Sequence, residues 1–351
     1  MTLIKANLAD LSYDKMDFLI EWGCKPFRKD QLFDAVMQFK SYDEISNLPK
    51  EVINKLKENF FDHALKVEKT IDGKDGVQKF LFRLNDSNII EGVFMPHNYG
   101  NTLCVSTQIG CRMGCSFCAS GLNGLVRNLT AGEILSQVLS INRIKGGDKN
   151  KRAITNVVLM GSGEPLDNFD NTIDFLKMIS HPKGINISLR NISLSTCGIP
   201  PKIIELADLS LPVTLSISLH AATDKKRNKI MEINKAYNLF SVIEAAKYYF
   251  EKTKRRIIFE YALIDNENSD EQSAEELARL IRGLNCHVNL INLNPVREKG
   301  HRGVSNQKIK DFMAALDRNN ISNTLRRSMG NDIDGACGQL RNSYIKEGNA
   351  H

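Results

Sequence analysis

Apolar residues recur at helical spacing near the start of the chain. They return every three or four positions over 27–39 and again over 48–60, and polar or charged residues fill most of the positions between them. This spacing predicts two amphipathic helices, each with one apolar face to bury. We therefore expect residues 1–65 to form a small helical accessory domain.

The pattern changes after this domain to short apolar runs rich in aromatic and β-branched residues. Such runs are typical of strands. They cover 77–84, 89–95 and 103–107. The turn signals around them are Asp72-Gly73, Asp75-Gly76 and Asn98-Tyr99-Gly100. We expect a β-meander linker over 66–102.

From residue 103 onward, short apolar runs alternate with longer helical patterns. The candidate strands are 103–107, 154–160, 191–196, 213–219, 257–263 and 288–293. The helical stretches that follow them are 131–144, 170–180, 201–208, 239–252, 271–283 and 305–318. Six such units predict a parallel sheet with its helices on the outside, because the crossovers are right-handed. The expected fold class is α/β, a partial (β/α)6 barrel over 103–328 with a tail over 329–351, and its ligands should gather at the carboxyl ends of the strands.

Composition limits the classes of function without choosing one. The 351 residues are 42% hydrophobic and 25% charged, as in ordinary globular proteins. No apolar run reaches the roughly 18 residues of a membrane-spanning helix, and the first residues do not resemble a secretory signal. We expect a cytoplasmic protein that does not bind a membrane.

A formal net charge of +6 permits a polyanionic partner but does not establish one. Basic residues gather mainly in loops and at strand starts, where a phosphate-binding surface is a fair hypothesis. The clusters are Lys149, Lys151 and Arg152; Lys225, Lys226 and Arg227; Lys252, Lys254, Arg255 and Arg256; Arg297, Lys299 and Arg302; and Arg326 and Arg327.

Three of the eight cysteines, Cys111, Cys115 and Cys118, lie within eight residues, just after the first barrel strand. Structural zinc takes four ligands, and a [4Fe–4S] cluster usually takes four thiolates, so three thiolates would leave one iron open for a small ligand. A zinc site completed by Cys104 and a set of three ordinary thiols are the alternatives. The other cysteines are too few and too unevenly spread for a secreted disulfide framework.

This C-x₃-C-x₂-C run resembles the radical S-adenosylmethionine (SAM) superfamily. Met160-Gly161-Ser162-Gly163-Glu164-Pro165, after the second strand, resembles that superfamily's glycine-rich loop, which contacts the SAM amino group. The resemblance implies one [4Fe–4S] cluster on Cys111, Cys115 and Cys118. It also implies that the open iron binds the amino and carboxylate groups of SAM and that the cluster donates one electron to it.

Further motifs resemble a narrower family, the RlmN/Cfr RNA adenine methyltransferases. In chain order they are Lys25-Pro-Phe-Arg-Lys-Asp-Gln-Leu32, Glu91-Gly-Val-Phe-Met-Pro96, Cys104-Val-Ser-Thr-Gln-Ile-Gly-Cys111, Leu194-Ser195-Thr196, Ser218-Leu219-His220-Ala221, Asn294-Pro295 and Asp332-Ile-Asp-Gly-Ala-Cys337-Gly-Gln-Leu340. The resemblance implies methylation of adenosine carbon 2 in two RNAs. These are 23S rRNA, at the peptidyl-transferase centre, and tRNA, at the position 3′ of the anticodon.

The resemblance also implies a role for each site residue. Cys337 would take a methyl group from one SAM, a second SAM would supply the radical, Glu91 would accept the ring proton, and Cys104 would release the product through a transient disulfide. The implied SAM contacts are Gly163, Glu164, Ser195, Ser218, Leu219, His220 and Asn294. An electron donor such as flavodoxin and a monomeric state complete the expectation.

Two alternatives stay open from the residues. One is a Cfr-type enzyme that methylates carbon 8 of adenosine in 23S rRNA, although Arg326-Arg327 and Met329-Gly-Asn-Asp332 are more similar to RlmN. The other is a non-catalytic RNA-binding protein stabilised by zinc.

Overall fold

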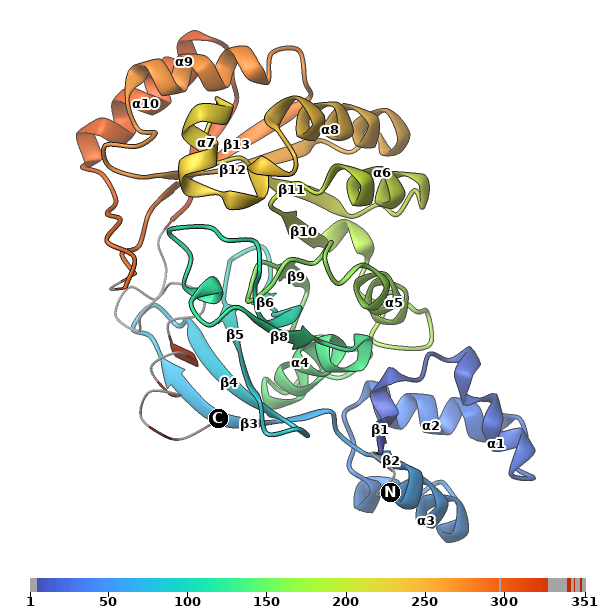
Figure 1. Ribbon diagram of the computed structural model, residues 1–351. Coiled ribbons are helices and arrows are strands. Elements are labelled where there is room, and N and C mark those ends of the chain that lie inside the picture. The colour runs from blue at the N-terminus through green and yellow to red at the C-terminus, as the bar shows by residue number, and fades with distance from the viewer. Residues whose placement is uncertain (1–4, 297, 328–339, 342–343, 345–347, 349–351) are drawn as a thin grey trace.

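The computed structural model describes residues 5–296, 298–327, 340–341, 344 and 348 (Figure 1). Its centre is a ten-stranded sheet in the order β14-β13-β12-β11-β10-β9-β6-β5-β4-β3. The strands are β3 (Leu65–Asp72), β4 (Gln78–Leu84), β5 (Ile89–Met95), β6 (Thr102–Cys104), β9 (Asn156–Leu159), β10 (Ile192–Thr196), β11 (Thr214–Ser218), β12 (Ile257–Leu263), β13 (Cys286–Asn292) and β14 (Asn323–Leu325).

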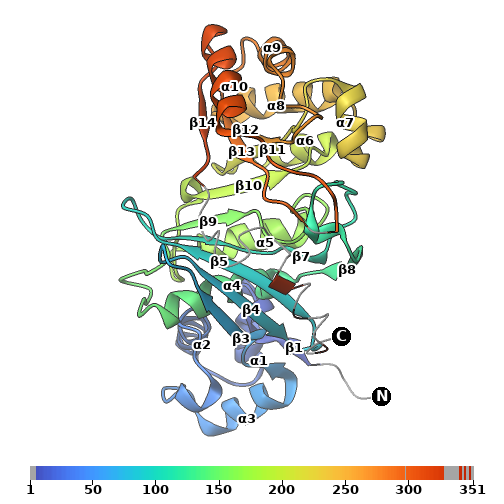
Figure 2. The same ribbon diagram turned by 90° about the vertical axis from the view of Figure 1, so that its left-hand side faces the viewer.

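The helical N-terminal segment packs below this sheet (Figure 2). Its helices are α1 (Phe18–Glu21), α2 (Phe27–Met37) and α3 (Lys50–Asn59), and the last two lie where the apolar spacing predicts them. Asp10 accepts a 2.7 Å hydrogen bond from the backbone N–H of Gly132 at the start of α4 (Ala131–Ile144). Glu44 forms an ion pair with Arg143 near the end of the same helix. Contacts at both ends of α4 therefore fix this segment against the sheet domain.

The meander contains the two predicted strands β4 and β5, and it adds β3, which the pattern did not predict. β3 to β6 are antiparallel neighbours. β3 forms one edge of the sheet and carries the charged residues Lys66, Glu68, Lys69 and Asp72, which discourage pairing with another chain. Because β3 has this polar composition, a search for apolar runs does not predict it.

The six predicted parallel strands are confirmed as β6 and β9 to β13, each paired in parallel with the next. β14 extends this part by one short strand. The helices that follow in chain order are α4, α5 (Phe169–Ile179), α6 (Pro200–Asp208), α8 (Leu239–Thr253), α9 (Glu271–Leu280) and α10 (Asn306–Arg318). α5, α6 and α8 line one side of the sheet (Figure 1). The elements not predicted in this part are the strands β7 (Gln108–Gly110) and β8 (Leu125–Asn128) and the helix α7 (Asp224–Ile230).

The parallel part of the sheet has one apolar and one polar face. Residues in register on neighbouring strands point to the same face, and the register aligns Ser195 with Ser216, and Ser218 with Glu260. Asn289 is aligned with Glu260 on the next strand. The alternate residues of these strands, such as Ile217 and Phe259, are fully buried in the core.

The polar face is concave. Arg326, just after β14, places its guanidinium 3.9 Å from the sulfur of Met160, just after β9. Five interstrand steps separate these strands, and in a flat sheet they would span about 24 Å, well beyond the length of an arginine side chain. The sheet therefore curves strongly around this face, as the expected partial barrel requires, while β14 and β3 remain its two ends.

No helix within the described part of the chain combines the length and the apolar character needed to cross a membrane.

Candidate functional site

The loop that carries the three neighbouring cysteines begins where the chain leaves β7. Gly110 has φ +81°, and a Cβ there would lie 1.9 Å from the carbonyl oxygen of Gly124. Gly114 has φ +70°, and its Cβ would lie 2.7 Å from the carboxylate of Glu232. Both positions demand glycine because the backbone is left-handed and closely approached. The loop is also held by a β-bridge between Cys115 and Met231.

The three thiols share one electrostatic environment. Burial raises the pKa of Cys111 to about 12, and the charge of Cys118 adds to this shift. Burial likewise raises the pKa of Cys115, and the charges of both Cys118 and Cys111 add to it. Three thiolates so close together need positive charge beside them, which a bound metal centre supplies.

The glycine-rich loop that follows β9 is fastened to the segment leading into the cysteine loop. The backbone N–H of Gly161 donates to the carbonyl of Val105 at 3.0 Å, and the N–H of Thr107 donates to the carbonyl of Ser162 at 2.9 Å. A Cβ on Gly161 would come within 2.7 Å of the Val105 backbone, so the two segments are in direct backbone contact. Gly163 has φ +110° and is packed equally closely against Gln108.

Glu164 is buried at 3% exposure, with both carboxylate oxygens bound by backbone amides. The N–H of Cys197 donates to Oε2 at 2.7 Å, and the N–H of Leu166 donates to Oε1 at 3.0 Å. Burial raises the pKa of this carboxyl, and these hydrogen bonds oppose the rise. Hydrogen bonds from the side chains of Thr196 and Cys197 also reach this carboxylate, which fixes its direction. A carboxylate is a pure acceptor and is the partner that an ammonium group requires.

Arg227 lies fully buried beneath the carboxyl ends of β10 and β11. Its guanidinium donates to the carbonyls of Cys197 and Ser218, and its Nε donates to the carbonyl of Leu219 at 3.1 Å. Its charge lowers the pKa of Cys115, against the larger effect of burial. Arg227 therefore joins the strand ends that carry Ser195, Ser218 and Leu219 to the cysteine loop.

This burial corrects one expectation. The sequence placed Arg227 in a basic cluster facing RNA, but its exposed fraction is 0%. Its neighbour Lys226 is engaged by Glu276 at 3.0 Å. Helix α7 turns Arg227 inward, and that helix has too few apolar residues to reveal a buried face.

His220 stands at the end of β11 in a left-handed conformation, with φ +53°. Its Nδ1 accepts a 2.9 Å hydrogen bond from the backbone N–H of Ala262, and its ring packs edge to face on Phe117 of the cysteine loop. Burial and the charge of Arg227 lower its pKa to about 3. The imidazole is therefore neutral, with Nε2 carrying the proton.

Asn294 lies in the loop after β13, half-buried. This loop reaches the cysteine loop, because His301 Nε2 and Ser116 Oγ are 2.9 Å apart. The contact joins the segments that follow β6 and β13, and four strands separate β6 from β13 in the sheet. The predicted SAM contacts thus all lie at the carboxyl ends of parallel strands, grouped around the cysteine loop.

Glu91 and Cys104 lie on one face of neighbouring strands. Cys104 on β6 is in register with Val93 on β5, and Glu91 is two residues from Val93, so the alternation of a strand puts both side chains on the same face. Glu91 is 2% exposed, and its Oε2 accepts a 3.1 Å hydrogen bond from the backbone N–H of Arg341. Cys337, the other predicted catalytic residue, lies outside the described residues.

Comparison with known proteins places this geometry in a family. The radical SAM superfamily model matches residues 105–281. A Clostridium tetani protein named "Probable dual-specificity RNA methyltransferase RlmN" is 48% identical over 343 residues, which cover 97% of each chain. A Lachnospira eligens protein with the same name is 44% identical over 345 residues, again covering 97% of each chain. The chain belongs to the RlmN family of radical SAM proteins.

A solved relative shares the whole fold of this RlmN-family chain. The crystal structure of a radical SAM methyltransferase from Sphaerobacter thermophilus matches with a TM-score of 0.91 and 39% identity, over 95% of this chain and 98% of that one. The agreement extends through the helical segment and the meander as well as the radical SAM domain. The expected fold class is confirmed.

Membership of the radical SAM superfamily implies a [4Fe–4S] cluster and SAM. Within the described part of the chain, no three His, Cys, Asp or Glu side chains are grouped tightly enough around one point to hold a single metal ion. A [4Fe–4S] cluster binds each thiolate through a different iron atom, so its ligands stand farther apart. Cys111, Cys115 and Cys118 lie near enough for the charge of Cys118 to raise the pKa of the other two thiols, and they would hold such a cluster through three of its irons.

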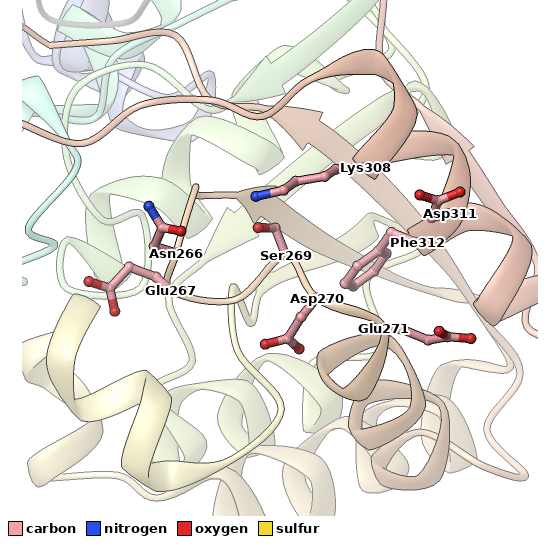
Figure 3. Close-up of a pocket in the computed structure, with 8 residues that line it drawn as sticks. All are labelled: Asn266, Glu267, Ser269, Asp270, Glu271, Lys308, Asp311 and Phe312. Carbon is pink, nitrogen blue, oxygen red and sulfur yellow. The ribbon is translucent and has the colours of Figure 1, made fainter.

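One cavity of about 440 Å³ lies away from this site, between α9 and α10 (Figure 3). Its lining consists of Asn266, Glu267, Ser269, Asp270, Glu271, Lys308, Asp311 and Phe312. None of these is a predicted site residue of the RlmN family. The predicted site residues Ser195, Ser218 and Cys104 lie instead on the concave face of the sheet.

Sequence reasoning did not place three residues that lie beside the predicted site residues: Arg227, Glu260 and Arg341. It assigned Arg227 to a basic cluster facing RNA and singled out neither Glu260 nor Arg341. The available signal was the strand context of Glu260, since an isolated carboxylate in a buried strand needs a reason.

Proposed function

We propose that this protein methylates carbon 2 of adenosine in 23S rRNA and in tRNA by a radical SAM mechanism. The reaction would use one [4Fe–4S] cluster on Cys111, Cys115 and Cys118, and two molecules of SAM per turnover. We further propose that the enzyme works as a cytoplasmic monomer supplied with electrons by a flavodoxin-like donor.

The proposal rests on the contact between the C-terminal tail and β5, the strand that carries Glu91. Cys104 lies on the same face of the neighbouring strand β6. Leu340 packs on Leu81 and Ile89, and Arg341 donates its Nε–H to the carbonyl of Ile89 at 2.7 Å. These contacts fix the tail on the strand that carries Glu91.

Chain length limits how far Cys337 can lie from this point. Leu340 is the third residue after it, and three residues span at most about 11 Å. We propose that this tether brings Cys337 to Glu91 and Cys104, so that the three groups act on one substrate carbon.

Carbon 2 of adenine is an electron-poor C–H position with no lone pair to attack a sulfonium methyl group. A bound cluster and SAM supply the radical that such a carbon requires. In our proposal Cys337 carries the methyl group as a thioether, and the radical removes one hydrogen atom from it so that the methylene carbon can bond to carbon 2. Glu91 then takes the proton from the ring carbon. The Cys104 thiolate attacks the sulfur of Cys337 and breaks its bond to the methylene carbon, which takes up a proton to become the product methyl group, while the two sulfurs form a disulfide and the unpaired electron returns to the redox centre.

The surroundings of Glu91 suit a proton acceptor. It is buried on β5, and its Oε2 accepts the backbone N–H of Arg341, which fixes the direction of the carboxylate. A positioned carboxylate within reach of the ring is the geometric requirement for a general base.

Analysis of methylated nucleosides tests the proposal. We expect 2-methyladenosine in 23S rRNA and tRNA after incubation with the reconstituted, reduced protein and SAM. The names of the relatives, dual-specificity RNA methyltransferase RlmN, support methylation of RNA. The appearance of 8-methyladenosine alone would overturn it in favour of Cfr-type chemistry.

A further inference from the structure

Glu260 is a buried carboxylate on the polar, concave face of the sheet. It sits on β12 at 4% exposure, in register with Ser218 on one side and Asn289 on the other. Its Oε1 accepts a 3.0 Å hydrogen bond from the amide of Asn289. Its Oε2 has no hydrogen-bond partner among the described residues. A buried carboxylate oxygen without a partner is costly, so its retention calls for a ligand.

The orientation of Glu260 is set by a chain of side chains across the same face. Asn289, which holds Oε1, accepts through its own carbonyl from Thr324 Oγ1 at 3.2 Å. Thr324 Oγ1 in turn lies 2.9 Å from His287 Nε2. This network holds Oε1 from the side of β13 and β14. Oε2 is left to face the rest of the concave face.

The position of Glu260 indicates which ligand Oε2 can contact. Ser218, a proposed SAM contact, is its in-register neighbour, and adjacent strands are about 4.8 Å apart. The backbone N–H groups of Leu219 and His220 both donate to the carbonyl of Glu260, at 3.1 and 3.4 Å. A ligand that touches Ser218 therefore lies within reach of Oε2.

We propose that Glu260 Oε2 accepts a hydrogen bond from the amino or hydroxyl hydrogens of an adenosine bound on the concave face. The inference rests on the proposed function, in which two adenosines approach this face, one in SAM and one in the RNA. A carboxylate oxygen is a pure acceptor, and the exocyclic amine and the ribose hydroxyls of adenosine are donors.

Charge around Glu260 is consistent with this role. Burial raises the pKa of its carboxyl, whereas the charge of Arg326 and the Asn289 hydrogen bond lower it. Arg326 spans the concave face to Met160 and forms no ion pair with Glu260 within the described residues. The carboxylate therefore has a cation nearby and an oxygen left for a ligand.

Binding measurements on Glu260→Gln test the inference. In this variant the amide can keep its carbonyl oxygen toward Asn289, and its NH2 group then replaces Oε2. A ligand N–H or O–H that Oε2 would attract is then repelled by the amide hydrogens. We expect SAM affinity, measured by equilibrium dialysis under anaerobic conditions, or affinity for an unmodified tRNA transcript, measured by filter binding, to fall at least tenfold. Selective loss of SAM binding assigns the contact to the SAM adenosine, and selective loss of RNA binding assigns it to the target adenosine.

Two controls separate this role from a structural one. Glu276→Gln alters another largely buried carboxylate, which lies on α9 and pairs with Lys226 of α7, and it should leave both affinities unchanged. The melting temperature of Glu260→Gln should equal or exceed that of the wild type, because the unpartnered charge is removed. Unchanged affinities, or a lowered melting temperature with both affinities reduced alike, would overturn the inference. Wild-type protein that fails to bind SAM would instead contradict the proposed function.

Discussion

The backbone N–H of Arg341 donates a 3.1 Å hydrogen bond to Oε2 of Glu91, across 250 residues of chain. This contact joins the C-terminal tail to the strand that carries the proposed proton acceptor. Tyr344 adds a second anchor, since its hydroxyl donates to Glu68 at 3.1 Å. The described tail residues Leu340, Arg341 and Tyr344 therefore contact the meander.

Leu340→Asp should uncouple this tail from Glu91. Leu340 is 7% exposed against Leu81 and Ile89, and burying a carboxylate there is strongly unfavourable. We expect RNA methylation to fall at least tenfold, while iron content and reductive SAM cleavage stay at the wild-type level. Leu209→Asp, at a side chain 44% exposed, is the matched control. Full methylation by Leu340→Asp would show that tail docking is dispensable.

Cys104→Ala should trap a covalent adduct between the protein and its RNA. Without the resolving thiol, the bond between Cys337 and the substrate carbon cannot be released as a disulfide. Denaturing electrophoresis and mass spectrometry of nuclease-treated protein detect such an adduct. The double variant Cys104→Ala/Cys337→Ala should form none, and an adduct in that variant would remove the role assigned to Cys337.

Cys118→Ala should abolish cluster assembly, whereas Cys197→Ala should not. Cys197 is also a buried thiol near the site, with its backbone N–H on Glu164, but it lies outside the cysteine loop. Iron and sulfide analysis after anaerobic reconstitution, with the absorbance of the cluster, measures the difference. Equal iron content in the two variants would contradict the assignment of ligands.

Arg227→Lys should destabilise the fold despite keeping the charge. Lysine cannot reproduce the fork that binds the carbonyls of Cys197, Ser218 and Leu219 at once. Loss of charged hydrogen bonds in a buried site costs about 2–4 kcal/mol in free energy of unfolding. Chemical denaturation of the anaerobic holoprotein measures this cost. A change below about 1 kcal/mol would show that the strand ends do not depend on this contact.

His220 predicts a pH dependence of stability. Its folded pKa is about 3, below the ordinary value of about 6.5 expected on unfolding. The unfolded chain therefore binds one more proton between these values, and stability falls as the pH drops from about 6.5 toward 3, by up to about 1.4 kcal/mol per pH unit. His220→Asn keeps a residue that tolerates the left-handed backbone and removes the titration. Its stability should decline less than that of the wild type between pH 7 and 5, and parallel curves would refute the assignment.

Much of the fold followed from periodicity alone. The parallel strands place apolar residues on the face that packs into the core, and polar residues such as Ser195 and Ser218 alternate with them on the concave face. The pattern did not predict β14, because this strand has only three residues. It did not predict helix α7, because the sequence Asp-Lys-Lys-Arg-Asn-Lys-Ile has almost no apolar face.

The site could be predicted where spacing in sequence carries the chemistry, as with Cys111, Cys115 and Cys118. It could not be predicted where the contact is made across the sheet. Glu260 was not predicted because its neighbours Ser218 and Asn289 lie on other strands. Arg341 was not predicted because its partner Glu91 is 250 residues away in the chain, and no local sequence pattern indicates such a contact.

Nucleoside mass spectrometry tests the central claim most directly. Purified 23S rRNA and tRNA without the modification are incubated, free of oxygen, with the reconstituted protein, SAM and a strong reductant, and then digested. The account predicts 2-methyladenosine in both RNAs, with 5′-deoxyadenosine released alongside it. RNA that gains no methyl group on carbon 2, from a protein that carries its cluster and cleaves SAM, would contradict it.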